Sequence, residues 1–103
     1  MARQTSNRGN QTAAQYEWVT VEDGVNIKLS KGDYFSLQWF GAVIHGCAVR
    51  DGRNGPFISW PSFRGSDGQY VKRAYVYAGR GSEDERLLEA VVTTVIEERK
   101  HDH

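Results

Sequence analysis

Turn signals recur at short intervals between residues 16 and 81, and their spacing constrains the fold more than any other feature. They are Asp23-Gly24, Lys31-Gly32-Asp33, Gly41, Asn54-Gly55 and Ser66-Asp67-Gly68. Glycine, asparagine and aspartate favour such positions because they tolerate positive φ or hydrogen-bond to the neighbouring backbone. The segments between the turns are short and rich in β-branched and aromatic residues, as is typical of strands. The sequence therefore predicts an antiparallel β-sheet of about four to six strands.

Three of these segments differ in how many strands they are expected to form. Residues 34–51 form either two strands that meet near Gly41 or one long strand that bends there. Residues 56–60 form a short strand that ends at Pro61, since proline cannot donate a hydrogen bond to a sheet. Residues 69–78 (QYVKRAYVYA) are predicted to form a single strand. Alternation along that strand would place on one face Val71, Arg73, Tyr75 and Tyr77.

An amphipathic helix is predicted to begin after Ser82. The Ser82 side chain can cap backbone N–H groups, and Glu85 can complete a capping box. An apolar stripe at helical spacing follows, made of Leu87, Leu88, Val91, Val92, Val95 and Ile96. Because the run VVTTVI has low helix propensity, this helix needs tertiary packing to be stable. The fold class is therefore α+β: an antiparallel sheet followed by one C-terminal amphipathic helix packed on it.

The chain of 103 residues is long enough for one core. Residues 1–15 are predicted to be a disordered tail, residues 16–100 a single α+β domain and residues 101–103 a frayed C-terminus. The sequence has no apolar run of about 18 residues and no hydrophobic N-terminal stretch, so no membrane partner is expected. The single Cys47 cannot form an intramolecular disulfide, which favours the cytoplasm. Because one helix leaves part of a sheet exposed, a homodimer is expected.

Charge is unevenly distributed along the chain although the net charge is zero. The basic side chains of residues 48–81 outnumber the acidic Asp51 and Asp67; they are Arg50, Arg53, Arg64, Lys72, Arg73 and Arg80. Residues 82–103 have the opposite imbalance, with three basic and seven acidic side chains. Two interpretations are open: the acids only solvate the helix, or the basic segment forms a surface for a polyanion.

Aromatic residues are interleaved with these basic residues. Single-stranded nucleic acids bind to proteins through aromatic faces on which bases stack and through cations that follow the phosphates. The predicted phosphate contacts are Arg53, Arg64, Lys72, Arg73 and Arg80, and the predicted stacking residues are Trp60, Tyr75 and Tyr77. The alternative is that many aromatics, about half of them, form the core under the helix.

Signals for an enzyme are weak. His45 and Cys47 are two residues apart on a predicted strand, which places them on the same face, as a nucleophile or a metal site would require. The alternative is a partly buried thiol beside a sheet histidine. His101 and His103 lie on the terminus that is expected to fray, and no Lys-Ser or Lys-Thr follows the glycines near Arg53 as in a phosphate loop. We therefore expect no catalytic residues, no metal and no cofactor.

Residues 43–77 resemble the SpoVG family of septation regulators, and the resemblance covers about residues 35–100. The similarity consists of a strand ending in Val49-Arg50-Asp51-Gly52, then Asn54-Gly55, Phe57-Ile58, Pro61-Ser62 and Asp67-Gly68, with a C-terminal helix after them. The resemblance implies a small antiparallel sheet with a helix, a homodimer and nucleic-acid binding in a regulatory role. This chain differs in its N-terminal tail and hairpin and in its tyrosine-rich segment, so nucleic-acid binding is the part expected to carry over.

These observations together predict a homodimeric, non-enzymatic regulatory or protective protein that binds nucleic acid and prefers single-stranded DNA. The alternative is a protein-interaction module, a virus- or host-encoded inhibitor or adaptor that uses sheet edges and exposed aromatics.

Overall fold

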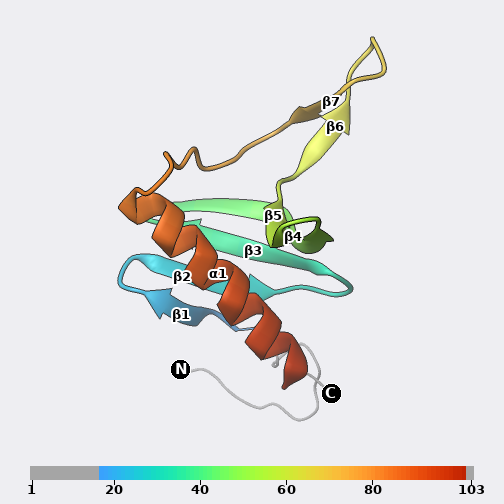
Figure 1. Cartoon of the computed structure of the whole chain (residues 1–103). Helices are drawn as coiled ribbons and strands as arrows, with labels where there is room; N and C mark the ends of the chain where they lie inside the picture. The colour runs from blue at the N-terminus through green and yellow to red at the C-terminus, as the bar shows by residue number, and fades with distance from the viewer. Residues whose placement is uncertain (1–16, 102–103) are drawn as a thin grey trace.

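A five-stranded antiparallel sheet with one helix across it forms the body of the protein, and a two-stranded hairpin projects from it (Figure 1). The structure is a computed structural model that describes residues 17–101. The elements are β1 (Val19–Glu22), β2 (Val25–Leu29), β3 (Tyr34–Trp39), β4 (Ala42–Gly52), β5 (Gly55–Ser59), β6 (Ser62–Arg64), β7 (Tyr70–Lys72) and α1 (Glu83–Lys100). The predicted α+β class is confirmed. The predicted tail, residues 1–15, lies outside the described residues, as do residues 102–103, whereas His101 is the C-cap of α1.

The five strands follow each other in the sheet in chain order, so each neighbouring pair is a hairpin. Their turns follow the sequence signals. At the β3–β4 turn Phe40 and Gly41 both have positive φ, 48° and 94°, as in the tight turns that match the twist of paired strands. Of the two interpretations of residues 34–51, two strands that meet at Gly41 is therefore correct.

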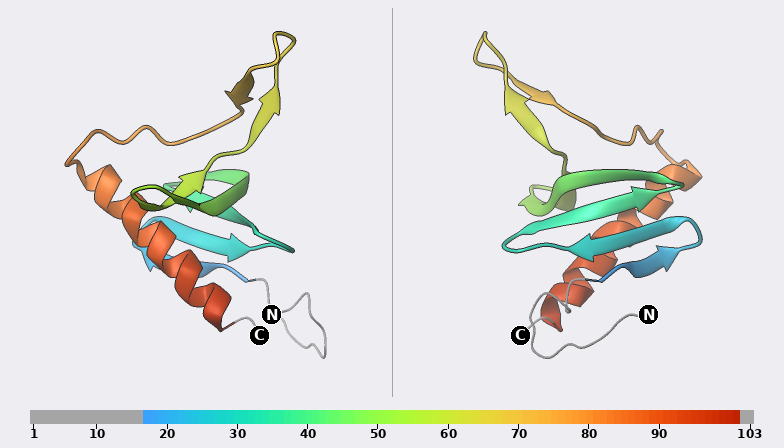
Figure 2. Two further views of the ribbon diagram at one scale, coloured as in Figure 1. Left: turned by 45° about the vertical axis from the view of Figure 1, so that its right-hand side comes forward. Right: turned by 180° about the vertical axis from the view of Figure 1, so that it is seen from behind.

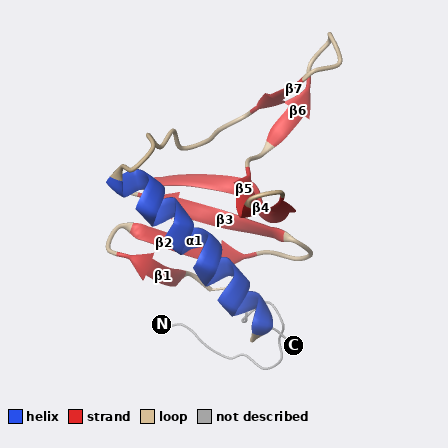
Figure 3. Cartoon of the chain, in the orientation of Figure 1, coloured by secondary structure: helices blue, strands red, loops and turns tan. Residues whose placement is uncertain are grey.

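The core lies between one face of the sheet and α1. Residues 25, 27 and 29 of β2 pair with residues 39, 37 and 35 of β3, which places Ile27, Leu37 and Phe35 together under the helix. Leu87, Val91 and Val95 of α1 are buried against them, and the remaining stripe residues are half-buried. Figure 3 shows α1 lying across the sheet, and the burial of its stripe residues confirms the predicted packing. Among the described residues no helix is long and apolar enough to cross a membrane.

Ser82 begins the helix as predicted. Its Oγ accepts a hydrogen bond from the Glu85 backbone N–H at 3.1 Å. Glu85 Oε1 accepts from the Gly81 N–H at 2.7 Å, one residue earlier than in a standard capping box. An N-cap of this kind typically contributes about 1 kcal/mol to stability.

The hairpin formed by β6 and β7 lies apart from the main sheet (Figure 2). The prediction of one strand over residues 69–78 is wrong, because β7 spans only Tyr70–Lys72. Its partner β6 begins after Pro61, and the last bond of the pair runs from the Arg73 N–H to the Pro61 carbonyl at 2.7 Å. Residues beyond Arg73 have no partner strand in the described chain, so the chain bends there and continues extended to α1.

Candidate nucleic-acid interface

A bulge in β4 decides which residues reach each face of the sheet. Ile44 pairs with Leu37 and Cys47 pairs with Phe35, so His45 and Gly46 together lie opposite the single Ser36. Gly46 has φ 83°, a conformation that favours glycine. His45 consequently lies on the face away from the helix, where Nδ1 is 2.7 Å from Ser36 Oγ, and Cys47 lies in the core. The prediction that the two side chains share a face is wrong, because the extra residue reverses the alternation.

Cys47 is a core residue with an unreactive thiol. Its side chain is fully buried, its thiol donates to the Ile44 carbonyl at 3.7 Å, and burial raises its pKa to about 12. A neutral thiol is a poor nucleophile and a poor metal ligand. Across residues 17–101 no group of three or more His, Cys, Asp or Glu side chains is placed to hold a metal ion.

We expect Cys47 to resist a thiol reagent at pH 8 in the native protein and to react at once in denaturant, because thiolate formation is suppressed in the core. Since the folded state holds the proton to higher pH, the free energy of unfolding should fall as pH rises from about 9 towards 12. Absorbance of the released thiol product measures the reaction. Fast labelling of native protein at pH 8 would contradict the buried position.

No helix or strand of the described residues covers the face of the sheet opposite α1, as the view from behind in Figure 2 shows. Alternation with the core residues places several polar and aromatic side chains on this open face. Its members include Asn26, Lys28, Tyr34, Ser36, Gln38, Val43, His45 and Arg50. Asn26 donates to Gln38 Oε1 at 2.8 Å, so part of the face is ordered by its own side chains.

A groove of about 710 Å³ lies where the open face meets the projecting hairpin. Its aromatic and basic side chains come from β3, β4, the β5–β6 connection, β7 and the residue that follows β7. They are Tyr34, His45, Arg50, Trp60, Tyr70 and Arg73. No carboxylate is among the described residues that line it. The groove therefore combines cations with exposed aromatic rings, as Tyr34 is 49% and Tyr70 73% exposed.

Aromatic rings hold the cations in and around this groove. The Arg50 guanidinium lies 5.9 Å from the Tyr34 ring centroid, and the Arg73 guanidinium lies 5.4 Å from that of Phe63. The Lys72 ammonium is 5.0 Å from the centroid of Tyr75. Such contacts are worth about 0.5–1 kcal/mol at exposed sites and orient the side chain without neutralising its charge. These cations are therefore positioned before any anion arrives.

Arg50 has the only ion pair near the groove within the described chain. Its Nη1 is 3.4 Å from Asp33 Oδ2, and the two side chains are 42% and 79% exposed. Exposed pairs of this kind contribute about 0–1 kcal/mol. A phosphate can replace Asp33 at this low cost.

The structure brings together only some of the predicted contact residues. Trp60 and Arg73 line the groove, although Trp60 is half-buried and also packs against the core. Arg64 and Lys72 are exposed on the hairpin, and Tyr75 lies beside Lys72.

The other three predicted residues lie elsewhere. Arg53 is in the β4–β5 turn, next to the strand end where Asp51 lines a pocket against α1. Tyr77 and Arg80 lie on the connection from β7 to α1. A single copy therefore does not gather all eight predicted residues into one site.

Four residues of the groove are not among the contacts predicted from the sequence: Tyr34, His45, Arg50 and Tyr70. Alternation along residues 34–38 could have placed Tyr34 on the face opposite the core. Arg50 belongs to the basic segment of the sequence and could have been predicted as a contact on that ground. Their meeting depends on strand pairing between residues far apart in the chain, which no local pattern shows.

Arg86 of α1 pairs with two acidic side chains, one on α1 and one on β1. Arg86 donates to Glu83 and to Glu22 Oε2, the latter at 3.4 Å. This hydrogen bonding lowers the pKa of Glu83 and raises the pKa of Arg86. Glu83 therefore already has a cationic partner on the same helix.

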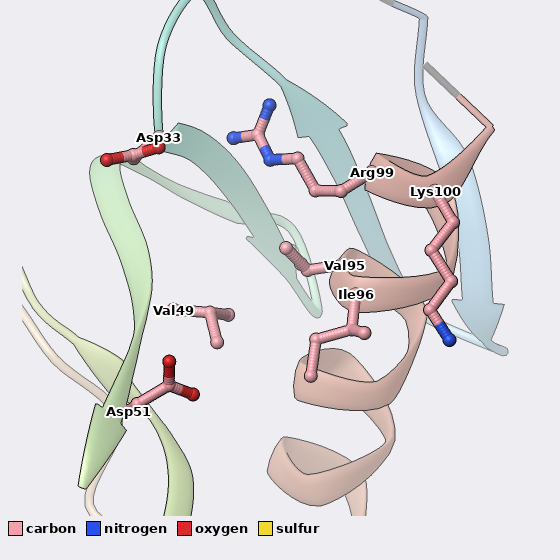
Figure 4. A pocket seen from close by; sticks show the side chains of 7 residues that line it. All are labelled: Asp33, Val49, Asp51, Val95, Ile96, Arg99 and Lys100. Carbon is pink, nitrogen blue, oxygen red and sulfur yellow. The ribbon is translucent and has the colours of Figure 1, made fainter. Parts of the chain in front are cut away.

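A second pocket, of about 490 Å³, lies between β4 and the last turns of α1 (Figure 4). Val49, Val95 and Ile96 form its apolar interior. Its rim carries both signs of charge, and Arg99 uses its guanidinium to donate to the Tyr34 carbonyl at 2.8 Å. This pocket suits a polyanion less well than the groove does.

No protein-family model, no curated protein and no solved structure matches this chain.

Proposed function

We propose that this protein binds nucleic acid through the groove and the neighbouring hairpin, without catalysing a reaction, and that it prefers single-stranded DNA. The observation that carries the proposal is the meeting of Arg50 and Arg73 with Tyr34 and Tyr70 in a groove lined by no described carboxylate. Cations bind the phosphates, and exposed rings stack on bases.

The preference for single strands follows from the geometry of the aromatic residues. Tyr34 and Tyr70 are 49% and 73% exposed, and only an unpaired base has a face that can stack on such rings. A duplex reader of the helical kind needs a basic helix for the major groove. The one helix in the described chain begins with Glu83, Asp84 and Glu85 and is rich in acids.

The separation of His45 from the buried Cys47 removes the pair of residues on which an enzymatic hypothesis rested. The free thiol of Cys47 is compatible with a reducing compartment, and we assign the protein to the cytoplasm. A small binding protein of this kind would act in regulation or in protection of single strands.

The first test is fluorescence anisotropy with a labelled oligothymidine, with a duplex of equal length as the control. If Arg50, Arg64, Lys72 and Arg73 each neutralise one phosphate, the salt slope should be about −3, which weakens binding about 50-fold between 50 and 200 mM salt. The duplex should bind more weakly at every salt concentration. Absence of binding, or binding that salt does not change, would refute the proposal.

A protein-interaction role is the second candidate, favoured by an apolar groove between β5 and α1. Its lining includes Phe57, Ile58, Leu88 and Val92, with Glu89 at the rim. Capture of one specific protein that persists after nuclease treatment and is lost in Leu88→Asp would favour this role over the first.

A further inference from the structure

Residues 74–78, between β7 and α1, behave as a strand that lacks a partner. Their side chains alternate, with Ala74, Val76 and Ala78 half-buried and Tyr75 and Tyr77 exposed, 54% and 81% respectively. Val76 packs against the core, so the segment is held in place. Both views in Figure 2 show it running separately from the sheet.

The backbone of this segment makes no hydrogen bond to other described backbone groups. The Arg73 N–H bonds to Pro61 on one side, and the Ser82 N–H bonds to Gly79 on the other. Between these bonds lie five residues of strand-like composition with free N–H and C=O groups. An extended edge of this kind is a template for a strand from another chain.

The order of the five residues points to a second copy as that chain. Residues 74–78 read Ala-Tyr-Val-Tyr-Ala, which is the same in both directions. Antiparallel pairing about a two-fold axis at Val76 therefore places Ala opposite Ala, Tyr opposite Tyr and Val opposite Val. Aromatic residues directly opposite each other are favourable cross-strand pairs, and a self-complementary patch is what a two-fold dimer requires.

We propose that residues 74–78 pair with the same segment of a second copy, and that the two copies together complete the nucleic-acid surface. Lys72 and Arg73 precede the paired segment, and Arg80 follows it. Antiparallel pairing therefore brings Lys72 and Arg73 of one copy close to the partner's Arg80. Tyr77 and Arg80, which lie away from the groove in one copy, join the hairpin cations of the other. The use of these joined cations rests on the proposed function, whereas the pairing itself does not.

The pairing also couples dimer formation to ligand binding. Cations gathered from two copies repel each other, and a polyanion that spans them removes this repulsion. Binding of an oligonucleotide should therefore strengthen the dimer, and dimer formation should strengthen binding by the same factor.

Disulfide trapping of two single variants, Tyr75→Cys and Tyr77→Cys, tests the pairing directly. In the proposed register residue 75 faces residue 77 of the partner, at the roughly 5 Å Cα separation that a disulfide accepts. Two residues 75, or two residues 77, are offset by about 7 Å along the strand and are too far apart. Both side chains are exposed, so neither change should disturb the fold, which circular dichroism verifies.

The two variants are oxidised separately and as an equal mixture, without nucleic acid and in salt that screens the cations. We expect a disulfide-linked dimer in the mixture and none in either variant oxidised alone. The parent protein should form none either, because its Cys47 is buried. Equal linkage in a single variant, or none in the mixture, would overturn the pairing. Oligonucleotide binding is measured separately, so a failed linkage with intact binding refutes the pairing alone, and linkage without binding refutes the proposed function alone.

Discussion

The double variant Arg50→Gln/Arg73→Gln is expected to bind single-stranded oligonucleotide about 150-fold more weakly at low salt, which corresponds to about 1.5 kcal/mol for each cation. Each change removes a cation from the groove, and hydrogen bonds to charged groups are worth about 1.5–3 kcal/mol, nearer the lower value at an exposed site. The salt slope should become shallower by about 1.4, because two fewer phosphates are neutralised. Fluorescence anisotropy over a salt series measures both changes.

The matched control is Arg53→Gln/Lys100→Gln, which changes the net charge by the same amount. Arg53 lies in the β4–β5 turn, and Lys100 lies on α1, 3.8 Å from Glu97. We expect this variant to bind almost as well as the parent protein. Equal losses in the two double variants would show that total charge governs binding and that the groove is not the site. The control also tests the sequence-based prediction that Arg53 contacts phosphate.

Phe35→Ala is expected to destabilise the protein by about 3–5 kcal/mol. Phe35 is fully buried and is the largest of the side chains buried between the sheet and α1. The cavity left by its ring removes contacts to both layers. For a domain of this size the melting temperature should fall by on the order of 20 °C, which thermal unfolding followed by circular dichroism measures.

Phe57→Ala is the control for this second result. Phe57 pairs with Arg50 in the edge strand β5, lines the groove between β5 and α1, and is 49% exposed. Its replacement should cost less than about 1 kcal/mol, because little apolar surface is lost from the interior. A loss as large as that of Phe35→Ala would contradict the half-exposed position of Phe57 in this structure.

Local signals predicted most of the secondary structure. The turns at Asp23-Gly24 and Gly41 and the helix after Ser82 lie where the sequence places them, since each depends on backbone preferences within a few residues. The strand predicted for residues 69–78 ends at Lys72, although the composition of residues 74–78 is also typical of a strand. A strand needs a partner, and in the described chain the partner strand begins only after Pro61.

The candidate site could be predicted only in part. Arg73 and Trp60 were selected because they lie in the basic and aromatic segment, and both line the groove. Tyr34 was not selected, because it lies outside that segment and its place beside Arg50 depends on pairing between β3 and β4.

The amino-acid sequence by itself determined the elements, the α+β class and the separation of basic from acidic residues along the chain. The tertiary structure alone decided which side chains share a face. One extra residue at Gly46 sends His45 to the open face and Cys47 to the core. The physical reason is that strand side chains alternate with a period of two, so a single inserted residue reverses the face of those beyond it.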